Sequence, residues 1–500
     1  MKTIYVLFLV LFGNATSHSQ RGPIVSTSTN QQLYANAFAG SDIGAQITNA
    51  VSYASTNSLT CNIRVTPGTI STTFQLPQNC SIYFAPGNYT VAAQIWAAHR
   101  DTNWTFDHAI FIDAYDAGHP AFLVGKQCSG TVNTSGITVT YVSGCNFNQV
   151  DVGDIFNIAG GQYNIASVTP PDTLTLVAPA GTNTSVPFEI TMGGVSYIGQ
   201  SQTVTINNLT LYKTSGTTTA TDGLHIEGAS DVRVNNATVE GFSNAGSYAL
   251  NMIGSISDYI FGFKTNSNAA CLNMGGRKFG DRQYDSNDNS FFKLDCASGG
   301  GSKNGATMIL GASGGASGNN FYGLHIEGNT NPNQIEFARK GACRNRVFGF
   351  WEESNGAAKG STWENLSGCQ NGLYGGWFDH PNGIDSTAMT TSGSGSYSIL
   401  EDIDLGSGYQ YGWTFSAATG RVFNVNTGTA TNQGNPLNIF NNGTIGLVSG
   451  ATISSASGIP SGSCSVGSLY TNTGASSTST VLYLCYPANT WNPVLIPRAH

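Results

Sequence analysis

Acidic side chains recur at a fixed interval in the second half of the chain. Glu327, Glu353 and Asp379 are 26 residues apart (353−327 and 379−353). His325 precedes the first of them by two residues, and Trp351 and Trp377 precede the other two by the same step. Two carboxylates about 5 to 10 Å apart can cleave a glycosidic bond, and exposed tryptophans offer apolar surfaces for sugar rings. The spacing therefore predicts a site for a polysaccharide.

The same interval belongs to a longer repeat. Four ten-residue segments resemble one another when aligned on a leading asparagine, and successive asparagines are 30, 26 and 26 residues apart. A period in the twenties, with short strands and Gly, Ser and Asn turns, is typical of a solenoid in which each repeat forms one rung. The leading residues are Asn289, Asn319, Asn345 and Asn371. The alignment predicts a column across neighbouring rungs made of Asp295, His325, Trp351 and Trp377.

The alternation of side chains along a strand predicts which residues of the repeat reach solvent. Leu324 and Ile326 would point into the coil, so that His325 and Glu327 point outward. The same register places Glu352 at an inward position, which indicates a bulge or an error in the alignment. Carboxylates on neighbouring rungs would be ~4.8 Å apart, and those on alternate rungs about twice as far.

Several roles are open for this cluster. Its oxygen atoms could hold Ca²⁺, which prefers oxygen ligands. A lyase using that ion would need a separate base, for which His325 and Arg346 are the candidates, while Asp295 is a candidate sugar-binding residue. Each outward acid or histidine could instead be ordinary solvated surface, and each tryptophan could be covered by a loop.

A six-residue string recurs letter for letter, at Gly223–Gly228 and at Gly323–Gly328. Leucines spaced by 26, 22 and 22 residues connect the two copies and predict one continuous column: Leu224, Leu250, Leu272 and Leu294. The outward residues of these earlier rungs are interpreted as a structural polar ladder: His225, Asn251 and Asn273.

Composition favours an all-β fold. Glycine accounts for 62 of 500 residues, charged residues for only 10% and hydrophobic residues for 40%. That mixture is too apolar for disorder and too rich in glycine for long helices, but it suits short strands joined by tight turns. The net charge of −8 and the lack of a basic cluster argue against a nucleic-acid partner.

The beginning of the chain predicts export. Residues 1–19 contain Lys2, then the apolar run Ile4–Phe12, then small and polar residues, as in a secretory signal peptide. No second apolar stretch is long enough to span a membrane. A secreted, extracellular protein is therefore expected.

The ten cysteines agree with an oxidising compartment. Consecutive pairs are separated by 19, 17, 25, 26 and 21 residues, each about one rung, and neighbouring rungs lie within disulfide reach. The spacing predicts the bridges Cys61–Cys80, Cys128–Cys145, Cys271–Cys296, Cys343–Cys369 and Cys464–Cys485.

A helix is predicted over residues 41–54, with Ser41 or Asp42 as its N-cap. A strand-like segment with a Pro-Gly turn follows at Cys80–Val91. The helix has the form Asp-x-Gly-Ala-x-Ile-x-x-Ala and the strand carries Phe-x-Pro-Gly-x-Tyr, and together they resemble the start of pectate-lyase-like right-handed parallel β-helix proteins. The matching residues are Asp42, Gly44, Ala45, Ile47, Ala50, Phe84, Pro86, Gly87 and Tyr89.

The resemblance covers roughly residues 40–380 and implies a right-handed solenoid capped at one end by the helix. It implies no single activity, because this superfamily includes lyases, hydrolases, epimerases and tail-spike proteins. The polygalacturonase-type members of the superfamily carry Asn-Thr-Asp, Asp-Asp, Gly-His-Gly and Arg-x-Lys motifs. This chain does not contain these four motifs in order, and Thr221–Gly223 is only a fragment of the first.

Changes in composition divide the chain. We expect a signal peptide at 1–19, a flexible lead at 20–40, and a parallel β-helix at 41–385 with a β-insertion at about 125–200. A Ser/Gly/Thr-rich connection at 386–434 and a small β module at 435–500 would follow. The last module could end the fold, bind carbohydrate or form a homotrimer.

The sequence thus favours a secreted polysaccharide-active enzyme, a hydrolase or a lyase, whose acidic centre is Glu327, Glu353 and Asp379. A non-catalytic glycan-binding or adhesin-like protein could use the same groove. A purely structural solenoid is the third hypothesis.

Overall fold

The computed structural model describes residues 31–113, 120–126, 128–158, 161–192, 204–214, 219–279, 282–297, 299–338, 341–353, 360–367, 369–379, 387–406, 409–416, 418–426, 430–433, 438–441, 444–447, 452–474 and 482–494. The predicted signal peptide and most of the predicted flexible lead lie outside these residues.

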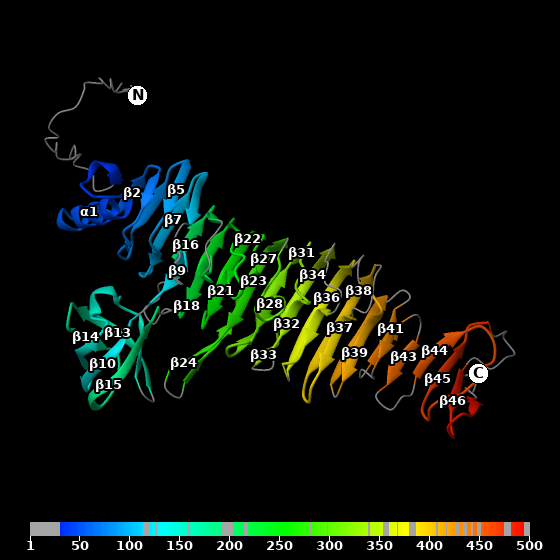
Figure 1. The fold of residues 1–500 in the computed structure, drawn as a ribbon. Coiled ribbons are helices and arrows are strands. Elements are labelled where there is room, and N and C mark those ends of the chain that lie inside the picture. Colours follow the sequence, from blue (N-terminus) through cyan, green and yellow to red (C-terminus); the bar gives the residue numbers. More distant parts are fainter. Residues whose placement is uncertain are drawn as a thin grey trace, which may run out of the picture.

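The chain forms an elongated parallel β-solenoid (Figure 1). One face, sheet B, consists of β6 (Ile95–Ala97), β9 (Phe122–Gly125), β18 (Leu224–Glu227), β21 (Tyr248–Ile253), β23 (Ala270–Gly275), β28 (Ala306–Leu310), β32 (Asn333–Phe337), β35 (Ser361–Asn365), β37 (Thr387–Ser392), β39 (Tyr411–Ser416) and β41 (Thr431–Gln433). Consecutive members of this sheet pair in parallel, so the chain makes one turn between them.

The second and larger face, sheet A, carries the candidate site. Its early rungs are β1 (Leu33–Tyr34), β2 (Asn62–Val65), β3 (Gly68–Ile70), β4 (Ser81–Phe84), β5 (Gly87–Val91), β7 (Thr102–Phe106), β8 (Ala109–Asp113), β16 (Val204–Asn207), β17 (Thr210–Lys213), β19 (Arg233–Asn235) and β20 (Thr238–Glu240). Its central rungs are β22 (Tyr259–Asn266), β27 (Ser290–Ala297), β30 (Asn320–Tyr322), β31 (His325–Glu327), β34 (Arg346–Glu353), β36 (Gln370–Phe378), β38 (Tyr397–Leu405) and β40 (Thr419–Asn426).

Each central rung of sheet A bends at one residue. In β34, Val347 and Phe350 are both buried although they are three residues apart, because Phe348 and Gly349 both face outward between them. The bend residue has a positive φ, which favours glycine because other side chains are strained there. Along the rungs the bend residues are Gly262 (φ 64°), Lys293 (φ 58°), Gly323 (φ 69°), Gly349 (φ 67°), Gly375 (φ 72°), Asp402 (φ 55°) and Asn424 (φ 49°).

The leading asparagines of the repeat form a buried ladder. Asn289, Asn319, Asn345 and Asn371 are all fully buried. The side-chain amides of the first three each donate to the side-chain oxygen of the asparagine on the next rung, with N–O distances of 2.9, 2.9 and 3.0 Å. A buried amide must be hydrogen-bonded to be tolerated, and stacking identical residues at the rung spacing supplies the partners. The feature that reveals the repeat in the sequence is thus a structural one.

The five disulfides join the predicted pairs, with Cα–Cα distances from 4.7 to 6.1 Å. Cys271–Cys296 links β23 of sheet B to β27 of sheet A, and Cys343–Cys369 joins neighbouring rungs. The rung spacing explains Cys61–Cys80 and Cys343–Cys369, which join neighbouring rungs. Cys128–Cys145 lies instead in the inserted barrel described below, and Cys271–Cys296 connects the two faces of the solenoid.

The predicted helix is α1 (Ile43–Thr56), at the N-terminal end of the solenoid (Figure 1). Asp42 caps it by accepting the Ala45 N–H at 2.8 Å, as expected for an N-cap. Its apolar face, including Ile43 and Ile47, is buried in the same hydrophobic cluster as Ile63 of β2.

A closed barrel is inserted between β9 and β16 and lies beside the solenoid (Figure 1). Its strands are β10 (Cys128–Ser135), β11 (Thr138–Gly144), β12 (Ile155–Ile158), β13 (Gly161–Thr169), β14 (Thr173–Leu176) and β15 (Thr182–Thr191). It has a hydrophobic cluster of its own. Buried ion pairs connect Lys126, which directly follows β9, to two aspartates of the barrel: Lys126 Nζ lies 2.9 Å from Asp151 and 3.0 Å from Asp154.

After β40 the strands are short and pair mostly antiparallel. They are β42 (Asn438–Asn441), β43 (Thr444–Leu447), β44 (Thr452–Ala456), β45 (Leu469–Asn472), β46 (Leu482–Cys485) and β47 (Trp491–Pro493).

The prediction of one continuous leucine column is wrong. The first copy of the six-residue string lies in β18 of sheet B, whereas the second surrounds β31 of sheet A. Leu272 pairs with Met308 in sheet B, and Leu294 pairs with Phe263 in sheet A. Both sheets bury alternate residues of each strand, so a short string does not specify the face to which it belongs.

Candidate functional site

The strands of sheet A bring the predicted site residues onto neighbouring rungs. Asp295 of β27 pairs with His325 of β31, which pairs with Trp351 of β34, which pairs with Trp377 of β36. Two residues further along, the outward position is occupied successively by Ala297, Glu327 and Glu353. The predicted columns are therefore present, because a constant rung length keeps the register.

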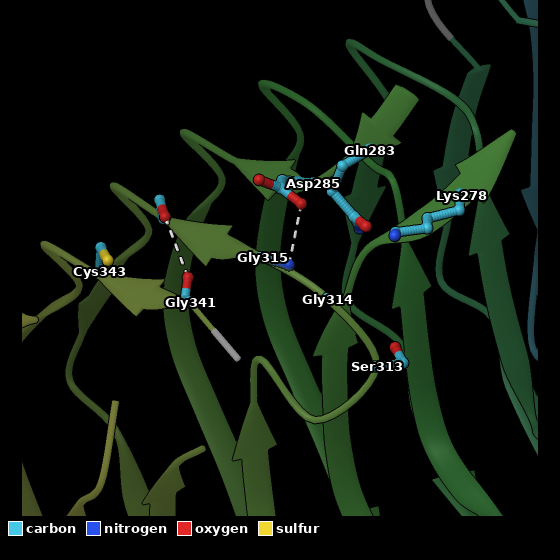
Figure 2. Close-up of a pocket in the computed structure, with 9 residues that line it drawn as sticks. Lys278, Gln283, Asp285, Ser313, Gly314, Gly315, Gly341 and Cys343 are labelled. Carbon is cyan, nitrogen blue, oxygen red and sulfur yellow. Dashed lines mark hydrogen bonds between the residues drawn. The ribbon is translucent and has the colours of Figure 1, made fainter. Parts of the chain in front are cut away.

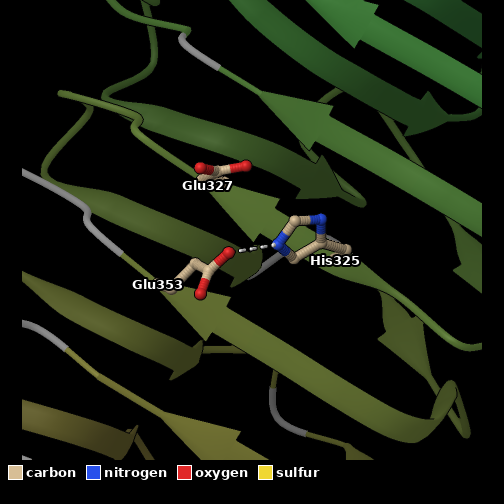
Figure 3. Close-up of side chains that lie close together, drawn as sticks. All are labelled: His325, Glu327 and Glu353. Atoms are coloured by element: carbon tan, nitrogen blue, oxygen red, sulfur yellow. Dashed lines mark ion pairs between the residues drawn. The ribbon is translucent and has the colours of Figure 1, made fainter.

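His325 is the centre of a compact charged cluster (Figure 3). Its Nδ1 lies 3.2 Å from Asp295 Oδ1, and its Nε2 lies 3.4 Å from Glu353 Oε1. One ligand-type atom from each of His325, Glu327 and Glu353 lies within 4.8 Å of the others. The imidazole is 30% exposed, and the carboxylates of Asp295 and Glu353 are each 36% exposed. A molecule arriving from solvent can therefore reach all of these groups.

Trp351 borders the cluster and is the most exposed tryptophan of the described residues, at 53%. Its indole N–H donates to Glu353 Oε2 at 3.2 Å, which fixes the ring beside the acid. The ring centroid of Trp377 is 5.3 Å away and the two planes meet at 64°. Because the rings are not stacked face to face, ring surface stays available to a ligand.

Asp379 and Arg346 are placed less favourably. Asp379 follows Phe378, which pairs with Glu352, so its backbone is one rung beyond Glu353. Arg346 is exposed, but it lies before the bend at Gly349, in a column with Asn320 and Gly372. Among the described residues no ion pair joins Arg346 to the acidic cluster, so its predicted role as an accessory base there lacks support from the geometry.

Glu352 points inward as the register predicts, without a bulge in the pairing of β34. It is fully buried and accepts a hydrogen bond from Thr362 Oγ1 at 3.0 Å and another from the Tyr409 hydroxyl. Burial raises the pKa of Tyr409 well above its usual value, and the negative charge of Glu352 raises it further. These partners satisfy the buried carboxyl, which gives it a structural role.

The sequence analysis missed an exposed ladder of aromatic rings on the other side of the bend. Successive ring centroids are 4.8, 5.0, 5.1 and 5.1 Å apart, with interplanar angles no greater than 17°. The rings are Phe261, Phe292, Tyr322, Phe348 and Tyr374. Each ring covers its neighbour's face, so the ladder presents mainly edges to solvent. The fourth residue of every repeat segment is aromatic, which was the available signal.

The predicted polar ladder on sheet B is confirmed, and it is part of a larger network. Asn273 donates to Asn251 at 2.7 Å, and Asn251 donates to Asp222 at 2.7 Å. Burial alone would lower the pKa of His225, but hydrogen bonds to Asp222 and Glu227 raise it to about 9. An imidazolium held by two carboxylates at neutral pH is an ion-paired structural group and a poor base.

The described surface is hollowed both beside the acidic cluster and away from it. One depression of about 570 Å³ contains Asp295 and His325 in its wall and therefore adjoins the cluster. Another, of about 600 Å³, lies away from the cluster and is bordered by Lys278, Gln283 and Asp285 over a glycine-rich floor (Figure 2). There Asp285 accepts the Gly315 N–H at 2.8 Å, so this acid stabilises a turn.

The ligand atoms that the cluster offers match the predicted Ca²⁺ only in part. Two of its three groups offer carboxylate oxygens, which suit Ca²⁺, but the third is the imidazole nitrogen of His325. Nitrogen is a ligand for zinc and other transition metals, whereas Ca²⁺ binds oxygen. Asp295 also holds His325 Nδ1, an arrangement common behind metal-binding histidines. The residues fit a zinc-like cation better than Ca²⁺.

No family model matches this chain. No curated protein matches it either. Similar solved structures include ORF18 of Geobacillus virus E2 (13% identity, TM-score 0.41, 83% of this chain and 64% of that chain). They also include PfbA, a surface adhesin of Streptococcus pneumoniae (9%, 0.43, 81% and 93%), and the A-module of the Azotobacter vinelandii mannuronan C-5 epimerase AlgE4 (10%, 0.34, 81% and 98%).

This chain thus spans just under two thirds of the viral protein. Similarities with TM-scores this low do not assign an activity to this chain. The resemblance to pectate-lyase-like proteins stays a prediction. Among the described residues, no helix is both long and apolar enough to cross a membrane.

Proposed function

We propose that this protein is an extracellular polysaccharide-active enzyme that binds a glycan across sheet A and cleaves it at Glu327 and Glu353. The observation that supports it best is the position of these two acids within 4.8 Å of each other, beside the half-exposed ring of Trp351. Carboxyl groups about 5 Å apart are typical of glycosidases that retain the anomeric configuration. This proximity favours a hydrolase over a lyase.

The surroundings of the two acids suggest distinct roles. Glu353 receives the indole N–H of Trp351 and faces the imidazole of His325, and both stabilise a carboxylate anion. Glu353 would attack the anomeric carbon to form a glycosyl ester while Glu327 donates a proton to the leaving oxygen. Glu327 would then take a proton from water, whose oxygen displaces Glu353. Asp379 would contact the sugar on the next rung.

Several features of the fold belong to the same proposal. The solenoid is right-handed and pectate-lyase-like, α1 caps its first coil, and the strands from β42 onward form a terminal module. The barrel at 128–191 supports the β-insertion expected at about 125–200. Five disulfides support an extracellular location, since such bridges persist in oxidising compartments. Trimerisation through the terminal module is a further expectation.

The test is a panel of plant and bacterial polysaccharides incubated with the wild type and with Glu327→Gln, Glu353→Gln and Trp351→Ala. We expect new reducing ends with the wild type and none with Glu327→Gln or Glu353→Gln, although both variants should still bind the glycan. Trp351→Ala should bind it more weakly. Glu240→Gln is the matched control, because Glu240 occupies the same outward column three rungs earlier. Unsaturated products would identify a lyase instead, and binding without cleavage would support the adhesin-like alternative.

A further inference from the structure

The depression beside the acidic cluster contains two lysines. Lys264 and Lys293 line it together with Asp295 and His325, and its volume is about 570 Å³. Lys264 occupies the outward column of the site one rung before Asp295, with which it pairs in register. The column therefore runs from Trp351 and His325, beside the proposed catalytic acids, into this lysine pocket, defined by Lys264, Lys293, Asp295 and His325.

Lys293 stands where its neighbours have no side chain. It is the bend residue of its rung, with φ 58°, between Gly262 and Gly323 on the adjoining rungs. A Cβ added at Gly323 would meet no atom within 4 Å, so the depression owes part of its space to the missing side chains. A lysine at positive φ is strained relative to glycine. A long cationic side chain at this position therefore needs an explanation other than backbone geometry.

The charges of these lysines are available to a ligand. Within the described residues neither Lys264 nor Lys293 takes part in an ion pair, although both are exposed. Lys126 and Lys213, by contrast, are buried and paired with aspartates. The chain as a whole carries a net charge of −8, which repels polyanions at long range. Binding an acidic polymer therefore requires a local cationic pocket of this kind.

We infer that the lysine pocket binds an anionic group on the sugar next to the cleaved bond, so that the substrate is an acidic polysaccharide. This inference rests on the proposed function, because the pocket is a subsite of the same groove. Ammonium groups act as point charges and accept a carboxylate, a sulfate or a phosphate. Asp295 Oδ1 faces His325 Nδ1 at 3.2 Å, and among the described residues no ion pair joins Asp295 to either lysine.

The test measures binding of a polyuronate, a sulfated polysaccharide and a neutral polysaccharide at low and high salt. The proteins are the wild type, Lys293→Gly, Lys264→Gln and the double variant. Lys293→Gly should fold at least as well as the wild type, because glycine prefers positive φ. The matched control is Lys303→Gln, which removes another exposed lysine in the loop before β28.

We expect the double variant to lose about tenfold in affinity for one of the two acidic polymers, because each exposed charge contributes a few-fold effect and the two effects multiply. Its salt dependence should weaken, while binding of the neutral polymer and the Lys303→Gln control should not change. The polymer that responds distinguishes carboxylate from sulfate recognition. Equal affinity for neutral and acidic polymers, or an unchanged double variant, would overturn the inference. If the lysine variants have no effect but Trp351→Ala still weakens glycan binding, the inference about the pocket fails and the proposed function survives. If no polymer binds to the wild type, the inference and the proposed function both fail.

Discussion

Removing one member of the asparagine ladder should destabilise the solenoid locally and strongly. The perturbation is Asn345→Ala. The side chain of Asn345 accepts hydrogen bonds from the backbone and side-chain amides of Asn319 and donates to Ala316 O and to Asn371 Oδ1. All four bonds are buried, and alanine removes all of them. At about 1 kcal/mol for each bond, the cost is about 4 kcal/mol.

The matched control is Asn320→Ala. Asn320 directly follows Asn319, which is the ladder residue of the rung before Asn345. Asn320 donates one partly buried side-chain bond, to Gly318 O at 3.1 Å, and its loss should cost about 1 kcal/mol or less. Because a long solenoid need not unfold in one step, the assay is native-state hydrogen exchange followed by mass spectrometry.

Amides of β30, β34 and β36 should exchange more than a hundredfold faster in Asn345→Ala, since 1.4 kcal/mol corresponds to about a factor of ten. Amides of β2 and β4 should be unaffected, because rungs contact only their neighbours. An Asn345→Ala protein no more labile than Asn320→Ala would refute the assignment of the ladder as a main stabiliser of these rungs.

Three further predictions concern pH, metals and the barrel. Burial raises the pKa of Asp258 to about 8, so its stabilising contribution is fully present below the unfolded value of 3.8 and is lost as pH rises through about 8. Asp258→Asn should therefore flatten the fall in Tm between about pH 5 and pH 8; an unchanged slope would contradict this. Zn²⁺ or Mn²⁺ should raise Tm more than Ca²⁺ does, and His325→Gln should remove the difference; a larger shift with Ca²⁺ would show that oxygen ligands dominate. Replacing Cys128 and Cys145 by serine opens a loop with a sequence separation of 17 residues, which should destabilise the barrel by about 3 kcal/mol while hydrogen exchange in β34 stays constant.

Much of the fold could be predicted because it is repetitive. A rung of nearly constant length produces a visible period, and the bridges Cys61–Cys80 and Cys343–Cys369, which join neighbouring rungs, agree with it. The columns through His325 and Glu327 followed from the same register. The interpretation of Glu352 as a possible misalignment failed for a local reason, since Thr362 and Tyr409 satisfy its buried carboxyl from other rungs.

Other features could not be obtained from local patterns. Identical strings at Gly223–Gly228 and Gly323–Gly328 lie on different sheets, because each face of a coil has the same alternation. Arg346 is close to the acids in sequence, but the bend at Gly349 places it on the part of the rung that carries the aromatic ladder. The depression that contains Lys293 depends on side chains missing from two neighbouring rungs.

The rung period, the inward positions of Leu324 and Ile326, the disulfide partners and the outward columns of acids and tryptophans could all be obtained from the sequence alone. These follow from periodicity and alternation, which act between residues of one strand or its immediate neighbours. Only the tertiary structure decided which face each strand joins, which outward groups meet, and that His325 links Asp295 to Glu353. Those contacts depend on the bend of each rung and on side-chain orientation, which no short stretch of sequence specifies.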